Sequence, residues 1–360
     1  MAGDVFLKAE ELRRTCRYRE ALALYRKALK TSTAQGDRDG ALSCLLSLGD
    51  THRMTGDFGA AAQYYEGAIA LSRVMRQKAL RADAMAGLGL SLRALGDWKG
   101  ALKLFGEAGA IYKERGDREG LAFLQWAQGG ALRVGGAAAK AIAAFKEAKR
   151  LFGSLGSDHE TAVGYCLCGL GGVSRMAGLW EDSLRYYTKA NSLLGSLRDR
   201  FGVAYSHCGI GNALRMKGDF AGAMQHLRKA ERVYRKIGDI VSYSYTLWSM
   251  GMTHLMKGRL TRAAQCFDDA ASRFRKTKDI RGIIYCRLAR GELFFLKGEK
   301  KRALAEFGKA LADSETHGFM IETAHARALL GYAESGRAEE TIHRKIGLRL
   351  RLTTIPFNIP

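Results

Sequence analysis

Six arginines recur along the chain with steps of 40, 40, 40, 42 and 40 residues. They are Arg13, Arg53, Arg93, Arg133, Arg175 and Arg215. A guanidinium group binds a carboxylate or a phosphate through two parallel hydrogen bonds, because its planar fork matches the planar acid. The row therefore predicts a surface that recognises negative charges. In the next two repeats the same position holds Leu255 and Phe295, so the row of arginines ends there.

A column of aromatic residues overlaps this row, at the position ten residues before each arginine or its replacement. Its members are Phe123, Tyr165, Tyr205, Tyr245 and Tyr285, and a position between the two columns adds Trp126 and Trp248. Such side chains supply rigid apolar area with a polar tip. We expect a groove with arginines in its N-terminal part and aromatic residues in its C-terminal part.

Two simpler interpretations of these columns stay open. Arg13 and Arg53 each have an acidic residue three positions earlier, Glu10 and Asp50, and such pairs form readily on one helix. The later repeats lack an acid at that position, so internal pairing does not explain the whole row. The tyrosines could instead pack between successive repeats.

No residue pattern indicates catalysis. The eight histidines show none of the spacings of zinc sites, and residues 169–172 resemble a nucleotide loop but follow no predicted strand. Cys166 and Cys168 stand two apart, which places them on different faces of a helix. An odd number of cysteines, seven, mostly inside predicted helices, indicates free thiols in a reducing compartment. We predict no enzymatic activity, no cofactor and no metal.

The arginines and aromatic residues must be positioned by a repeated pair of helices. Each arginine lies three residues before a glycine that should end the first helix of the pair in a left-handed conformation. These turn residues are Gly56, Gly96, Gly136, Gly178, Gly218, Gly258, Gly298 and Gly336, with Cys16 in the first repeat. An aspartate after several of them can cap the second helix. A fixed period of this size predicts a solenoid of stacked helix pairs.

Small and large residues alternate within each predicted pair. A glycine inside the first helix, such as Gly49 or Gly89, lets a neighbouring element approach closely. Alanines in the second helix, such as Ala101 and Ala108, let it lie against the first. The large residue between them is expected to fill the space between repeats. This residue is Tyr25, Tyr65, Phe105, Phe145, Tyr187, Phe267 or Phe307.

The third repeat shows the complete order: Leu88-Gly89, then Gly96-Asp97-Trp98, then Ala101, Phe105 and Ala108. This order resembles the tetratricopeptide repeat, and the 40-residue spacing is similar to that of the Leu-Gly-Asn-rich adaptors that orient mitotic spindles. The resemblance implies an all-α, right-handed superhelical solenoid of about nine helix-turn-helix repeats, with a groove that holds peptides lengthwise. No G-protein-binding tail is evident, so the cellular role of those adaptors is not carried over.

We expect the solenoid to span residues 1–343 and a basic, apolar C-terminal tail to span 344–360. The repeats are placed at about 2–36, 37–76, 77–116, 117–156, 157–198, 199–238, 239–278, 279–318 and, as a degenerate cap, 319–343. Residues 348–352 alternate between apolar and basic. No acidic residue follows Glu340, so the tail should match the arginines poorly. It is expected to cover the last repeat or be disordered; docking on an acidic partner or a membrane surface is the alternative.

The net charge of +22 favours acidic partners: a protein segment, nucleic acid or an anionic membrane surface. The chain has no long apolar stretch and charged residues near its start, which predicts a cytoplasmic protein without a transmembrane segment. We predict a non-catalytic scaffold or adaptor that binds an extended acidic-plus-apolar protein segment in its concave groove. The alternatives are RNA binding through the arginines and a peptide-sensing regulator. Self-association through the terminal repeats stays open.

Overall fold

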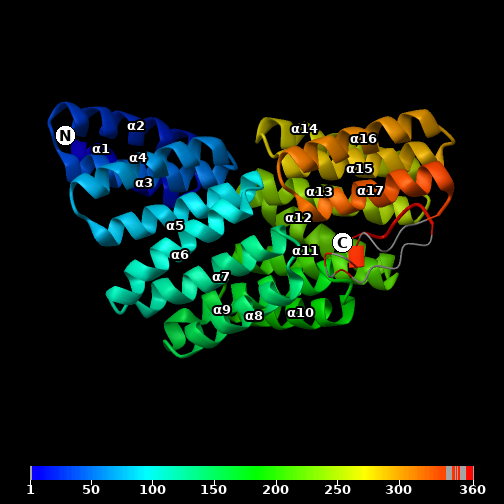
Figure 1. The fold of residues 1–360 in the computed structure, drawn as a ribbon, viewed down its shortest axis with the longest axis horizontal. Helices are drawn as coiled ribbons and strands as arrows, with labels where there is room; N and C mark the ends of the chain where they lie inside the picture. The colour runs from blue at the N-terminus through cyan, green and yellow to red at the C-terminus, as the bar shows by residue number, and fades with distance from the viewer. Residues whose placement is uncertain (1, 338–342, 345, 347, 349–353, 360) are drawn as a thin grey trace. The chain divides into compact units, whose positions relative to one another are not determined.

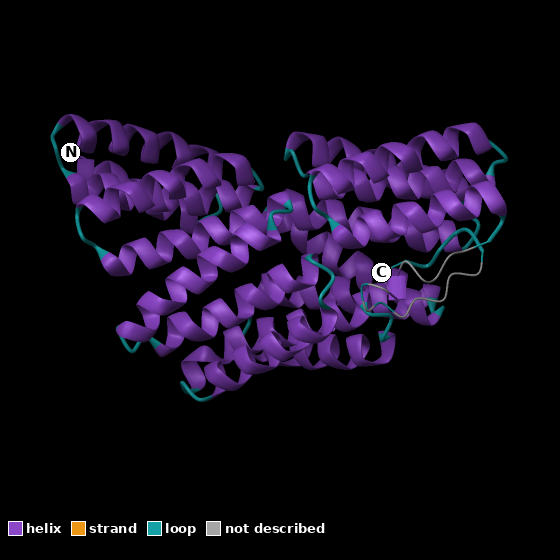
Figure 2. Cartoon of the chain, in the orientation of Figure 1, coloured by secondary structure: helices purple, strands orange, loops and turns teal. Residues whose placement is uncertain are grey.

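The computed structural model describes residues 2–337, 343–344, 346, 348 and 354–359, and in this part of the chain it contains helices and no strand (Figure 2). Consecutive helices lie side by side within α1 to α6 and within α8 to α17 (Figure 1). The helices are α1 (Ala2–Arg14), α2 (Tyr18–Ala34), α3 (Arg38–Thr55), α4 (Phe58–Val74), α5 (Lys78–Leu95), α6 (Trp98–Glu114), α7 (Arg118–Val134), α8 (Ala138–Gly153), α9 (Glu160–Met176), α10 (Trp180–Ser196), α11 (Arg200–Lys217), α12 (Phe220–Ile237), α13 (Ile240–Met256), α14 (Leu260–Lys276), α15 (Ile280–Leu296), α16 (Lys300–Thr316) and α17 (Met320–Ser335), with a short 3₁₀ helix at Ser157–His159. The predicted all-α solenoid of helix pairs is confirmed.

The chain forms two compact units, residues 1–127 and 128–360. We call them the first unit and the second unit. Helices α1 to α6 and the start of α7 belong to the first, and the remaining helices belong to the second. The predicted second helix of the ninth repeat falls largely on residues outside the described part of the chain. None of the described helices is both long enough and apolar enough to cross a membrane.

The turns inside the helix pairs have the predicted left-handed conformation. Gly56, Gly96 and Gly218 end their helices with φ angles of 83°, 99° and 93°. Cys16, which replaces the glycine in the first repeat, also has a positive φ, of 61°. The position therefore demands this conformation even where a side chain makes it unfavourable.

Aspartates begin many of the helices. The side chain of Asp97 accepts a hydrogen bond of 2.8 Å from the amide of Gly100 at the start of α6. Between repeats, Asp239 accepts one of 2.9 Å from the amide of Ser242 in α13. Each bond satisfies one of the free amides at a helix N-terminus. The predicted capping role is confirmed for Asp97, and Asp239 adds a cap at the first helix of a repeat that was not predicted.

The core of each unit is built from aromatic rings that face glycines of two successive repeats. A Cβ atom on Gly49 or Gly87 would lie 2.8 or 2.3 Å from the ring of Tyr65. In the second unit, a Cβ atom on Gly171 or Gly209 would lie 2.7 or 2.3 Å from the ring of Tyr187. The large residue thus fills the space between repeats, as predicted. The glycine is needed because a ring, and not a helix backbone, presses against it.

The region after α17 packs on the second unit in its described part. Ile355, Phe357 and Ile359 are buried, and Leu348 has no exposed surface. The ring of Phe357 meets that of Tyr332 of α17 edge-on, with 5.4 Å between centroids. The expected covering role is confirmed for these residues. The alternation predicted for 348–352 lies almost entirely outside the described residues.

Candidate functional site

A cavity of about 310 Å³ opens in the second unit and is lined by residues of α7, α9 to α13, α15 and α17. Six of the predicted site residues line it: Arg133, Arg175, Tyr205, Tyr245, Trp248 and Tyr285. The other lining residues are Gly172, Met176, Tyr187, Cys208, Gly209, Asn212, Tyr234, Val241, Ser242, Ser249, Arg281 and Ile321. Arginines and aromatic residues therefore share one cavity, whereas the sequence placed them in separate parts of a groove.

Arg133 and Arg175 have no acidic partner among the described residues. The Nε atom of each is buried without a hydrogen-bond partner, and neither guanidinium forms an ion pair within the described part of the chain. Gly172 makes room for one of them, because a Cβ there would lie 2.9 Å from Nη1 of Arg133. The described lining contains no acidic side chain. An anionic group entering the cavity would meet two unpaired cations in a partly desolvated setting, where attraction is strong.

Arg281 is a third arginine of the cavity, and the sequence analysis missed it. Its Nε donates to Oε1 of Glu322 at 2.8 Å, and Nη2 lies 2.7 Å from the same oxygen. Burial acts to lower the pKa of Arg281, but the Glu322 carboxylate outweighs it and raises that pKa. The preceding repeats carry Val241 and Phe201 at the same position, so no column marks it.

The aromatic side of the cavity is held rigidly by contacts within the protein. Nε1 of Trp248 donates to the carbonyl oxygen of Tyr285 at 3.2 Å, and their rings lie 4.9 Å apart. The ring of Tyr245 meets that of Tyr285 edge-on, at 6.3 Å. Fixed rings of this kind provide contact area for an apolar side chain at a low entropic cost.

Two tyrosines of the aromatic column also have a structural role. The hydroxyl of Tyr165 donates to Asp199 at 2.7 Å, and that of Tyr245 donates to Asp279 at 3.2 Å. Both aspartates cap the first helix of the following repeat. Tyr165 is not among the residues that line the cavity, so its place in a binding site stays a prediction. The packing interpretation describes it better.

The arginines of the first unit differ from those of the cavity. Nη2 of Arg13 lies 2.6 Å from Glu10, and its Nε donates to the hydroxyl of Tyr25 at 3.2 Å. Nη2 of Arg53 lies 3.6 Å from Asp50. Both have the internal pairs that the sequence left open. The chemically uniform row of arginines is therefore divided by its surroundings into paired and unpaired members.

Arg93, Phe123 and Trp126 form a separate group in the first unit. The guanidinium of Arg93 lies 5.8 Å from the ring of Trp126, a cation–π distance. The rings of Phe123 and Trp126 are 5.7 Å apart. These three predicted residues pack on one another, and the second unit's cavity contains none of them.

Arg215 is fully buried and is bound by the chain's own segment 354–359. Its Nη1 donates to the side-chain oxygen of Asn358, and its Nη2 donates to the carbonyl oxygen of Ile359 at 2.8 Å. The segment binds Arg215 through neutral oxygens and offers it no acid, in line with the expected poor electrostatic match. Burial, with a smaller effect of Arg175, lowers the pKa of Arg215 to about 9.

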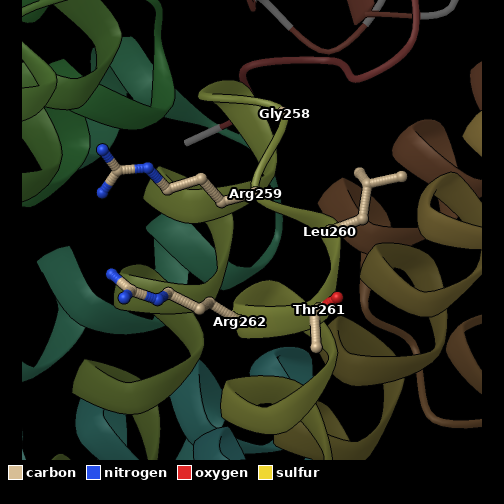
Figure 3. A pocket seen from close by; sticks show the side chains of 5 residues that line it. All are labelled: Gly258, Arg259, Leu260, Thr261 and Arg262. Atoms are coloured by element: carbon tan, nitrogen blue, oxygen red, sulfur yellow. The ribbon is translucent and has the colours of Figure 1, made fainter.

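A second hollow lies at the turn between α13 and α14 (Figure 3). It is lined by Gly258, Arg259, Leu260, Thr261 and Arg262, and the two arginine side chains extend side by side. One short stretch of chain makes up the whole lining, so it encloses no ligand.

No metal site was expected, and none of the described residues forms a group of three or more potential ligands among His, Cys, Asp and Glu. All seven cysteines are free, as predicted. Burial raises the pKa of the Cys166 thiol to about 12, and it also raises the pKa of Cys168. Both thiols therefore stay protonated at neutral pH, which makes them poor metal ligands.

The tetratricopeptide repeat family is matched at residues 7–73 and again at residues 46–113. The same helix pairs, glycine turns and aromatic packing continue through the second unit. The predicted tetratricopeptide repeats are therefore confirmed for residues 7–113. The likeness of its 40-residue spacing to the spindle-orientation adaptors stays a prediction. No curated protein sequence matches the chain.

Solved structures of Rap proteins have a similar fold. A Rap protein complexed with Competence and Sporulation Factor aligns with a TM-score of 0.60 at 12% identity, over 93% of this chain and 98% of that one. The apo form of RapI gives 0.60 at 15% identity, over 77% and 98%. Aspartyl phosphate phosphatase F from Bacillus subtilis gives 0.54 at 13% identity, over 98% and 96%. At these identities the likeness concerns the fold alone.

Proposed function

We propose that the protein is a non-catalytic scaffold or adaptor that binds an extended protein segment carrying acidic and apolar side chains. The cavity of the second unit is its main contact. An acidic side chain of the partner binds Arg133 and Arg175, and a neighbouring apolar side chain packs on Trp248 and Tyr285. The arginines of the first unit make weaker contacts, because internal partners already hold Arg13 and Arg53.

One observation carries the proposal: two buried, unpaired guanidinium nitrogens face a cavity with a rigid aromatic side and no acid among its described lining residues. A buried polar group without a partner is unfavourable, and a ligand that supplies the partner recovers that free energy. The aromatic side favours a partner with apolar residues over a bare inorganic anion. The similar fold of a Rap protein, solved in complex with Competence and Sporulation Factor, is consistent with a binding role.

RNA binding is the second candidate, because phosphates suit the arginines and bases can stack on tyrosines. The cavity speaks against it. Its tyrosines contact one another and Trp248 closely, so they offer edges and little open ring face. A cavity of about 310 Å³ accepts side chains more readily than a stacked run of bases.

The test is a binding assay with labelled peptides in which glutamate alternates with leucine or phenylalanine. A second set replaces each glutamate with glutamine. The proteins are the wild type, the cavity variant Arg133→Gln/Arg175→Gln and the control variant Arg259→Gln/Arg262→Gln. The control removes the same charge from the exposed hollow of Figure 3.

We expect the glutamate peptides to bind the wild type and the control equally, and the cavity variant at least tenfold more weakly, since a charged hydrogen bond contributes roughly 1.5–3 kcal/mol. Equal binding by both variants would mean that the affinity comes from net charge. Polyuridylate is included as the RNA probe. Tight, steeply salt-dependent binding of polyuridylate that the cavity variant loses would replace the scaffold proposal with RNA binding.

A further inference from the structure

Segment 354–359 lies on the second unit as a bound peptide would. Its alternate residues Ile355, Phe357 and Ile359 are buried, while Thr354 is exposed and Asn358 is half-buried. Every second side chain of the segment is thus placed against the receptor, as in many bound peptides. The receptor surface includes Tyr332 of α17.

The polar contacts of the segment centre on Arg215. The side chain of Asn358 accepts a hydrogen bond from this guanidinium and returns one, from Nδ2 to the carbonyl oxygen of Arg215, at 3.0 Å. Ile359 accepts the third, through its backbone carbonyl oxygen. Arg215 thus binds an amide and a peptide carbonyl, groups that any extended peptide containing asparagine could offer.

The position of Arg215 in the repeat connects the segment to the partner site. Arg215 is the next member of the row after Arg133 and Arg175, which line the cavity unpaired. Its neighbours belong to that cavity: Trp248 lies 5.9 Å from its guanidinium, and Asn212 accepts a hydrogen bond from its Nη2 at 3.4 Å. The segment therefore ends beside the cavity, on the line along which the arginines recur.

The positive charge of Arg215 is not balanced by the groups that accept its hydrogen bonds. Arg215 is buried with neutral acceptors. Burial raises the pKa of the Glu292 carboxyl well above its usual value, although the backbone of Phe357 and the charge of Arg215 act against this. A partner carboxylate would give Arg215 the countercharge that Asn358 does not supply.

We infer that segment 354–359 is an intramolecular ligand that occupies the Arg215 position of the partner-binding surface, and that a partner segment reaching from Arg133 to Arg215 must displace it. The inference rests on the proposed function for the partner, although the docking of the segment can be measured alone. A tethered ligand competes at an effective concentration in the millimolar range, so a segment whose own dissociation constant is about 100 µM weakens the binding of a competing peptide roughly tenfold.

The probe is a fluorescent synthetic peptide with the sequence of residues 354–359, Thr-Ile-Pro-Phe-Asn-Ile, titrated into full-length proteins. Asn358→Ala removes the side-chain contacts with Arg215 from the tethered copy while leaving the three buried apolar residues in place. We expect this variant to bind the probe about tenfold more tightly than the wild type, and Arg215→Gln added to it to abolish the gain. Circular dichroism and the urea midpoint establish that each variant is folded.

Equal binding of the probe by the wild type and Asn358→Ala, or a gain that survives Arg215→Gln, would overturn the inference. Hydrogen exchange gives a second readout that needs no peptide: amides of 354–359 should exchange faster in folded Asn358→Ala, and unchanged protection would also overturn it. The glutamate peptides separate the two proposals. If the proposed function is wrong, the glutamate peptides bind neither the wild type nor Asn358→Ala, while the probe still binds these two proteins with different affinities. If the inference fails, they bind both proteins with the same affinity.

Discussion

The packing of rings on glycines can be tested with two substitutions in one repeat, Gly89→Ala and Gly106→Ala. Both glycines lie inside helices, α5 and α6. A Cβ on Gly89 would lie 2.4 Å from Cε1 and 2.9 Å from Cδ1 of Phe105, whose side chain has no exposed surface. A Cβ on Gly106 would meet nothing within 4 Å. The two changes are chemically identical and differ only in their surroundings.

The expected magnitudes follow from this geometry. Alanine is favoured over glycine in a helix by about 1 kcal/mol, so Gly106→Ala should raise the free energy of unfolding by about that amount. Gly89→Ala has the same helical gain but forces a contact more than about 1 Å inside the van der Waals minimum of 3.5–4.0 Å. Overpacking typically costs about 1–3 kcal/mol, and the enclosed ring places this case near the upper end. The net loss should be about 2 kcal/mol.

Urea unfolding followed by far-ultraviolet circular dichroism measures both variants against the wild type. The difference between them should be about 3 kcal/mol, and it should appear in the transition that reports the first unit, because the stability of a solenoid is roughly a sum over repeats and their neighbours. If Gly89→Ala proves as stable as Gly106→Ala, the ring of Phe105 moves aside freely, and close packing does not explain the glycines.

Three further predictions concern other features. Cys16→Gly should raise the free energy of unfolding by about 0.5–1 kcal/mol in urea unfolding, because it relieves a residue held at φ 61°. Glu322→Gln should lower it by about 3 kcal/mol by leaving Arg281 buried without its ion, whereas Glu315→Gln, which breaks the exposed pair with Arg327, should change it by less than about 1 kcal/mol. Burial, with the nearby His226, lowers the pKa of His207 to about 4, so the folded state resists a proton that the unfolded chain accepts near pH 6.5. Stability at this site is therefore lost as the pH falls below about 6.5. Between pH 7.5 and pH 5, the free energy of unfolding of His207→Gln, measured in urea, should fall less than that of the wild type, by roughly 1 kcal/mol; equal falls would contradict the assignment.

The local features of this protein could be predicted from its sequence, because their causes lie within a few residues. A glycine at the turn, an aspartate after it and the alternation of small and large residues each act over one or two helical turns. The same pattern recurs at a fixed step, so the elements of an ambiguous repeat can be assigned from the repeats beside it. The aromatic residues that fill the space between repeats, such as Tyr65 and Tyr187, could be named on this basis alone.

The state of each arginine could not be predicted in the same way. Arg13 and Arg133 occupy equivalent positions, yet one is paired and the other lines a cavity without a partner. The difference depends on neighbours in adjoining helices. Arg281 escaped notice for a related reason: its partner Glu322 is 41 positions away, and neither residue belongs to a repeated column.

The sequence by itself determined that this chain is a stack of helix pairs with charged and aromatic residues at recurring positions, since periodic local signals specify periodic local structure. The tertiary structure alone decided which of those residues share a cavity and which are already occupied. Arg215 shows why. Its partner Asn358 lies 143 positions away in a segment without the repeat, and only the folding of that segment onto the second unit brings the two side chains together.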